Sequence, residues 1–142
     1  MKHLIIIVLL IFSFSGDAQE FKKLILTVKS PINKEIPIYI EPIDNDKVLA
    51  TDYLRNSLTF NGFKVLTDKS QSRYIIRITC HLRADTGCGG YVLKTLEGQI
   101  IDGKNNAEIL ATFSFSQGNF EGKCTSDIMS TLAKKINAEV AK

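Results

Sequence analysis

The chain has 142 residues, of which 44% are hydrophobic and 23% charged, with nine Gly and three Pro. This composition excludes collagen-like, coiled-coil and disordered chains, and the length predicts one domain, because independent domains run roughly 100–200 residues. The formal net charge is only +3, from Lys and Arg that alternate with Asp and Glu along the chain. That pattern is not the basic stripe that binds nucleic acid, so we expect no nucleic-acid partner.

The N-terminus has the three parts of a secretory signal peptide. Lys2 supplies a positive charge, an apolar run covers 4–12, and small side chains at Gly16 and Ala18 precede the predicted cleavage site. The run breaks into polar residues too early for a transmembrane helix, which needs about 20 apolar residues. We therefore predict a signal peptide over 1–18 and a single domain over 19–142 without a transmembrane segment. The alternative is an uncleaved N-terminal anchor.

Two strands are expected next. Apolar residues alternate with others over 24–28 and again over 36–41, a period typical of strands. Pro37 has no amide donor, so we expect the second strand to lie at an edge of the sheet. An edge strand there would be able to pair with a strand of a partner protein, which makes Tyr39 a candidate contact residue.

Over 44–61 the period of apolar residues changes to three and four, which predicts an amphipathic helix. Asp44 or Asp46 is its expected N-cap, because a short carboxylate can accept hydrogen bonds from the first free amides. Asn61 and Gly62 are its expected end, since both tolerate the left-handed conformation that closes a helix.

The remaining elements are four strands and a helix. Asp102–Asn106 is a strong hairpin turn, and Thr125 or Ser126 is the expected start of the last helix. The chain order is therefore β-β-α-β-β-β-β-α, or β-α-β-β-β-α if short strands merge. We predict an α+β fold, a mostly antiparallel sheet of four to six strands with two helices packed on one face. The four strands are expected over 63–67, 74–83, 91–101 and 107–116.

Three cysteines in an exported chain predict a disulfide. Cys88 directly precedes one arm of the predicted hairpin and Cys124 follows the other, so antiparallel pairing brings them close, and we prefer this bridge. Cys80–Cys88 is the alternative. Cys80 otherwise stays a buried free thiol. A metal site is disfavoured, because Cys80 and His81 are adjacent in a strand and point to opposite faces, and no C-x-x-C pair exists. We expect no metal and no cofactor.

Catalytic motifs are weak. Asp85-Thr86-Gly87 resembles the aspartic-protease signature, but those enzymes need a second carboxylate, and a local turn around Asp85 is the plainer interpretation. His81 is the one histidine after residue 18, and the sequence has no Gly-x-Ser-x-Gly motif to present a serine that this imidazole could activate. We expect no catalytic residues.

Surface recognition is the remaining class of function. The segment 117–123 places one aromatic residue between two glycines, which makes Phe120 and its neighbour Asn119 candidate contact residues beside Tyr39.

The layout also resembles a group of small bacterial cell-envelope proteins of unknown function. The shared features are a helix ending L-x-x-x-G-F over 58–63, a strand over 72–78, and a hairpin containing G-x-(I/L)-x-D over 98–102. It is similar in topology to the lipopolysaccharide-assembly lipoprotein LptE and the N-terminal domain of TolB. The resemblance implies a non-enzymatic role in the envelope, through a protein, glycan or lipid partner.

The sequence thus predicts an exported bacterial envelope protein that acts as a non-catalytic binding or assembly module. Its expected location is the periplasm or the extracellular space, and association with the outer membrane is compatible with this expectation. Two alternatives stay open: a small secreted hydrolase that uses Asp85, and a secreted inhibitor or immunity-type protein that uses the 117–124 loop.

Overall fold

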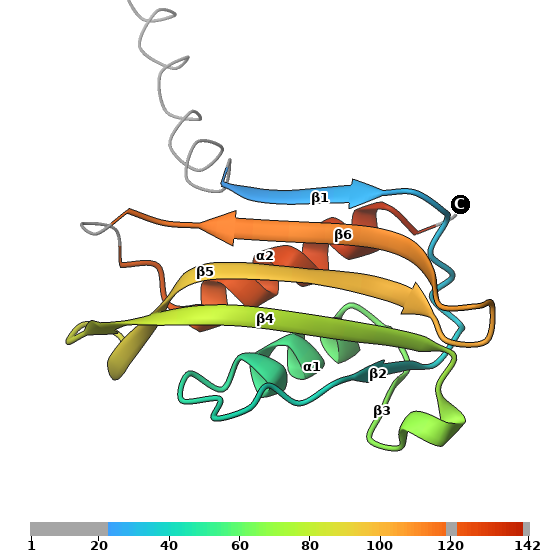
Figure 1. Ribbon diagram of the computed structural model, residues 1–142, viewed down its shortest axis with the longest axis horizontal. Helices are drawn as coiled ribbons and strands as arrows, with labels where there is room; N and C mark the ends of the chain where they lie inside the picture. The colour runs from blue at the N-terminus through green and yellow to red at the C-terminus, as the bar shows by residue number, and fades with distance from the viewer. Residues whose placement is uncertain (1–22, 119–121, 141–142) are drawn as a thin grey trace, which may run out of the picture.

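The computed structural model describes residues 23–118 and 122–140, so the predicted signal peptide and the candidates Asn119 and Phe120 lie outside the described residues. The described residues form six strands and two α-helices in the predicted order, and Figure 1 shows their arrangement. None of the described helices is long and apolar enough to span a membrane. The elements are β1 (Leu24–Val28), β2 (Ile38–Ile40), α1 (Ala50–Phe60), β3 (Val65–Leu66), β4 (Tyr74–Asp85), β5 (Gly90–Asp102), β6 (Glu108–Ser116) and α2 (Thr125–Ala138).

The six strands form one sheet in the order β1-β6-β5-β4-β2-β3. The first four are joined by antiparallel pairing, whereas β2 runs parallel to both β4 and β3. The α+β prediction is confirmed, with a sheet that is mixed. The expectation that the strand around Tyr39 forms an edge is wrong, because the short β3 pairs with β2 on the side away from β4.

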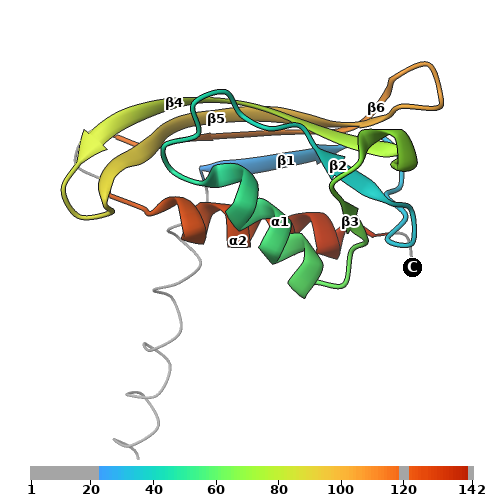
Figure 2. The ribbon, with the colours of Figure 1, turned by 90° about the horizontal axis from the view of Figure 1, so that it is seen from below.

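Both helices lie on the same face of the sheet, side by side, as Figure 2 shows. Their apolar stripes and the inward side chains of the strands form the core, which removes this apolar surface from water. Fully buried side chains come from both layers, among them Leu54, Leu58, Ile76, Leu96, Ile100, Ile128 and Leu132. No described helix covers the opposite face, which we call the open face.

The first helix begins later than predicted. Its N-cap is Leu49, which has a left-handed backbone (φ 55°) and makes no capping bond with its side chain. Asp46 still performs the expected chemistry from three residues upstream, because its two carboxylate oxygens accept from Ala50 N and Thr51 N at 2.9 and 2.8 Å. In the second helix the N-cap is Cys124, one residue before the expected start.

Candidate functional site

The open face is built by the alternate residues of β1, β6, β5 and β4. The register places one row of four side chains across these strands and a second row beside it. Because successive strand residues point to opposite faces, each of these side chains turns away from the helices. The two rows are Ile25, Ser114, Glu97 and Thr79, and then Thr27, Thr112, Gln99 and Arg77.

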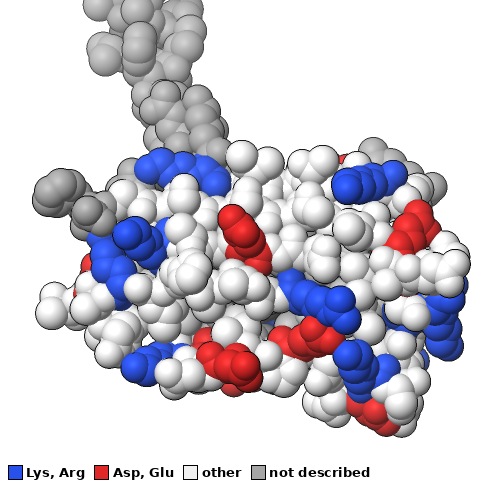
Figure 3. All heavy atoms as spheres, in the orientation of Figure 1, with Lys and Arg blue, Asp and Glu red and all other residues white. Residues whose placement is uncertain are grey.

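This face is mostly small, polar and uncharged. Figure 3 views it directly: uncharged atoms cover most of its middle, and most basic side chains lie toward the ends of the strands. Ile25 on β1 is the exposed large apolar side chain of this face, with 57% of its surface accessible. The open face therefore combines one exposed apolar side chain with several hydroxyl side chains.

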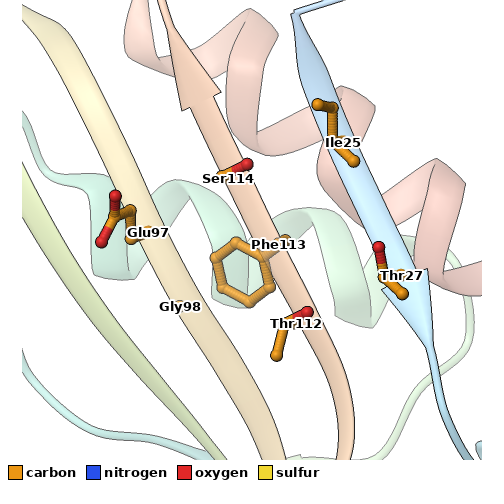
Figure 4. Close-up of a pocket in the computed structure, with 7 residues that line it drawn as sticks. All are labelled: Ile25, Thr27, Glu97, Gly98, Thr112, Phe113 and Ser114. Carbon is orange, nitrogen blue, oxygen red and sulfur yellow. The ribbon is translucent and has the colours of Figure 1, made fainter.

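A shallow hollow of about 280 Å³ opens on this face over β1, β6 and β5 (Figure 4). A second one, of about 340 Å³, lies over β4 and β5. Glu97 and Gly98 line both hollows. Both are open depressions of the surface, and their floor is the backbone of β5 at Gly98. The first is lined by Ile25, Thr27, Glu97, Gly98, Thr112, Phe113 and Ser114.

Ion pairs border the open face on the β4 side. Glu41 accepts from Lys69 Nζ at 2.6 Å and from Arg77 Nε at 2.9 Å. Partial burial alone would raise the pKa of Glu41, but the hydrogen bond from Lys69 and the charge of Arg77 outweigh it and hold the pKa below its usual value. The guanidinium of Arg77 is thereby fixed beside the second hollow.

Tyr39, one of the predicted contact residues, lies in β2 in register with Ile75 of β4. It is half-buried, and its strand neighbours Ile38 and Ile40 are buried on the helix side. Alternation therefore places Tyr39 on the open face, away from the hollow that Ile25 borders.

The predicted bridge between Cys88 and Cys124 is present, with 5.6 Å between the two Cα atoms. It ties the turn between β4 and β5 to the start of α2. Cys80 is the free thiol of the described residues and is half-buried. Burial raises the pKa of Cys80, and the nearby Asp46 carboxylate adds to the shift, so both favour the neutral thiol over the thiolate.

The buried side chain of Gln117 forms hydrogen bonds that connect the two described ends of the 117–123 loop. Gln117 donates from Nε2 to Leu93 O and to Lys123 O, and its Oε1 accepts from Lys123 N at 3.0 Å. Arg83 Nη1 also donates to Gly118 O at 3.1 Å. The stem of this loop is therefore fixed next to the disulfide, and no local pattern in the sequence predicts this role of Gln117.

Asp85 closes the turn that follows β4. Its Oδ1 accepts from Gly87 N at 2.7 Å, which is the local turn expected from the sequence. Its Oδ2 lies 3.7 Å from Arg83 Nη2. This carboxylate is engaged with its own turn and an arginine, whereas an aspartic-protease carboxylate shares a proton with a second acid.

His81 is exposed in β4 beside the irregularity in its pairing with β5, as expected for a solvated strand residue. Across the described ranges no group of three or more His, Cys, Asp or Glu side chains is close enough to hold a metal ion.

No protein-family model and no curated protein sequence matches this chain. Solved structures share its fold. A dodecameric PelC variant from Paraburkholderia phytofirmans is 16% identical, covers 83% of this chain and 98% of its own, and has a TM-score of 0.52. A PDZ domain protein from Parabacteroides distasonis is 13% identical over 84% of this chain and 36% of its own, with a TM-score of 0.57.

TolB from Acinetobacter baumannii is 15% identical over 80% of this chain and 29% of TolB, with a TM-score of 0.46. TolB is therefore among the solved structures to which this chain is similar. The likeness to LptE stays a prediction.

Proposed function

We propose that this chain is an exported envelope protein that works by association, with the open face of its sheet as the contact surface. The observation that carries the proposal is the division of the sheet: two helices cover one face, and no described element covers the other. Antiparallel strands can leave one face of a sheet solvated, and on this face Ile25 adds an exposed apolar side chain at the border of a hollow.

Export is supported by the signal-like N-terminal sequence and by the Cys88–Cys124 disulfide, since disulfides persist in oxidising compartments outside the cytosol. Assembly is supported more loosely by PelC, a protein of the same fold that forms a dodecamer. The partner belongs to the envelope and is a protein, glycan or lipid.

Site-specific photo-crosslinking in the native envelope tests this proposal. A photoreactive amino acid is placed at Gln99 or Thr112 on the open face, and at Thr59 on the exposed side of α1 as the control. We expect one discrete adduct from the open-face positions and none from Thr59. Adducts at Thr59 alone, or none from any position, would contradict the proposal.

A peptide-hydrolysis assay examines the alternative. The Asp85→Asn variant removes the carboxylate while the side chain can still accept from Gly87 N. Hydrolysis by the unmodified protein that disappears in this variant would favour the hydrolase over the association module.

A further inference from the structure

Two opposite charges border the hollow of the open face over β4 and β5. The register of these strands sets Arg77 opposite Gln99 and, two residues along, Glu97 opposite Thr79. Arg77 and Glu97 are therefore diagonal neighbours on adjacent strands, and they are the charged members of the two rows of this face. One cation and one anion thus occupy opposite corners of the hollow.

These two charges do not form an ion pair with each other. Arg77 is engaged on the side of β2, because its Nε donates to Oε2 of Glu41 at 2.9 Å. Among the described residues this is the hydrogen bond that its guanidinium makes, so the edge with the two Nη atoms stays available. Glu97 is exposed and takes part in no hydrogen bond or ion pair with the part of the chain that the structure describes. The open face therefore presents an available guanidinium edge and an available carboxylate.

This arrangement of charges indicates the chemistry of the partner. A surface of one sign would attract one of the two groups and repel the other, and like charges brought together oppose binding. A second copy of this chain carries the same two groups. In a two-fold interface a contact from one residue to another is made twice, once in each direction. Arg77 of each copy can therefore face Glu97 of the other.

The remaining corners of the hollow fit the same symmetry. A two-fold axis that exchanges the positions of Arg77 and Glu97 runs along the other diagonal, so Thr79 and Gln99 each face their own counterpart. A hydroxyl group and a primary amide both donate and accept hydrogen bonds, so each can pair with an identical group. All four corner side chains line the hollow, and together they are self-complementary.

We infer that the open face binds the open face of a second copy of this chain, in a two-fold dimer centred on the hollow over β4 and β5, with Arg77 of each copy paired with Glu97 of the other. This inference rests on the proposed association function and names its partner. At about 3.4 Å per residue and about 4.8 Å between strands, β1, β6, β5 and β4 present about 600 Å². Two such faces bury at most about 1,200 Å², the lower end of stable interfaces, so we expect a reversible dimer with a micromolar Kd.

Sedimentation velocity of the exported protein across the micromolar range measures this dimer. Glu97→Arg should weaken it at least about tenfold, because in a two-fold interface one substitution turns two attractive pairs into two repulsive ones. Arg77→Glu should weaken it similarly. Lys134→Glu changes the net charge as Arg77→Glu does, but on the exposed side of α2, and should leave the dimer unchanged.

Mixing the two weakened variants is the sharpest measurement. The Arg77→Glu copy carries two carboxylates and the Glu97→Arg copy carries two guanidinium groups, so a mixed pair regains both attractions. We expect a heterodimer about as strong as the original dimer. A mixture of Lys134→Glu with Glu97→Arg has the same net charges but regains only one attraction, so it should associate more weakly.

A protein that stays monomeric across this concentration range would overturn the inference, as would a dimer that Glu97→Arg leaves intact. Failure of the two weakened variants to associate on mixing would do the same. The photoreactive residue at Gln99 should give an adduct of twice the mass of the chain. An adduct at Gln99 with a protein of another mass would remove this inference and leave the association function standing.

A second approach applies if Arg77→Glu fails to fold by circular dichroism, since its new carboxylate stands beside Glu41. Thr79→Cys in a Cys80→Ser background places a thiol on the two-fold axis and keeps both charges. A short bifunctional thiol reagent should couple two such copies efficiently, whereas Thr59→Cys in the same background should give little coupling. Equal coupling of the two variants would contradict the dimer.

Discussion

The ring of Phe113 on β6 lies against Gly98 on β5, in the space that a side chain at position 98 would need. The two residues are in register, and a Cβ added to Gly98 would lie 2.3 Å from Cζ of Phe113 and 2.5 Å from Arg77 O. Glycine is therefore required at position 98 by the close approach of these atoms. The backbone conformation does not require it, since the φ of Gly98 lies outside the left-handed region. The same residue forms the floor that the two hollows share.

Substitution of Gly98 by Ala should destabilise the protein by about 2–3 kcal/mol, because the new methyl group overpacks against a ring and a fixed carbonyl. The measurement is chemical denaturation. Gly122→Ala is the matched control, since its Cβ would meet its nearest neighbour at 3.6 Å, an ordinary contact. Adding Phe113→Leu to Gly98→Ala should recover only part of the loss, because the clash with Arg77 O remains. An unchanged Gly98→Ala midpoint would contradict this packing.

Removal of the disulfide should lower the free energy of unfolding by about 3–4 kcal/mol, since the bridge closes a loop across a sequence separation of 36. The variant carries Cys88→Ser and Cys124→Ser and keeps Cys80, and thermal unfolding gives the difference. Cys80→Ser alone should have a smaller effect, because this thiol makes no covalent bond.

Intact mass should show the exported protein starting at Gln19 and two hydrogens lighter than after reduction. A mass equal to that of the reduced form would show that the disulfide is absent.

Asp102 should give the protein part of its resistance to acid. Arg73 donates to its two oxygens at 2.7–3.0 Å, and this pairing holds the pKa of the nearly buried Asp102 carboxyl below its usual value. A lowered pKa contributes stability that is present above the unfolded pKa of about 3.9 and is lost as pH falls through the folded value. Asp102→Asn should cost about 1–3 kcal/mol at pH 7.

The difference between the protein and its Asp102→Asn variant should shrink as the pH is lowered below about 4, and urea denaturation across this range measures it. Asp52→Asn is the control, because its ion pair with Arg55 is largely exposed and should contribute less than about 1 kcal/mol. A difference that stays constant down to pH 2 would show that the effect of the substitution is steric.

Local patterns in the sequence were sufficient for the element order and the disulfide, because alternation, helical period and hairpin pairing are properties of neighbouring residues. They failed where distant segments decide the structure. Pro37 suggested an edge strand, but β3 supplies a parallel neighbour to β2 that no local signal announces. Asp44 or Asp46 was the expected N-cap, yet the N-cap is the left-handed Leu49, which separates Asp46 from the helix and has no signal in the local sequence.

The open face was partly visible in the sequence. Thr112 and Ser114 alternate with Phe113 and Phe115, which already assigns the hydroxyl side chains to a face of their own. The alignment of this row with Ile25 depends on the pairing of β1 with β6, two segments about 85 residues apart, and hence on the whole topology. The hollow over Gly98 depends on the same pairing, so no local pattern in the sequence predicts it.

Gln117 should fix the stem of the 117–123 loop. Its side chain is 6% exposed and bonds Leu93 O, Lys123 O and Lys123 N, so its loss would leave buried backbone groups unsatisfied. Gln117→Ala should cost about 2 kcal/mol and should selectively speed hydrogen exchange at the Lys123 amide. Gln117→Glu is the sharper variant: a carboxylate can still accept from Lys123 N but cannot donate to the two carbonyls. Retained protection of Lys123 in Gln117→Ala would show that the disulfide alone holds the stem.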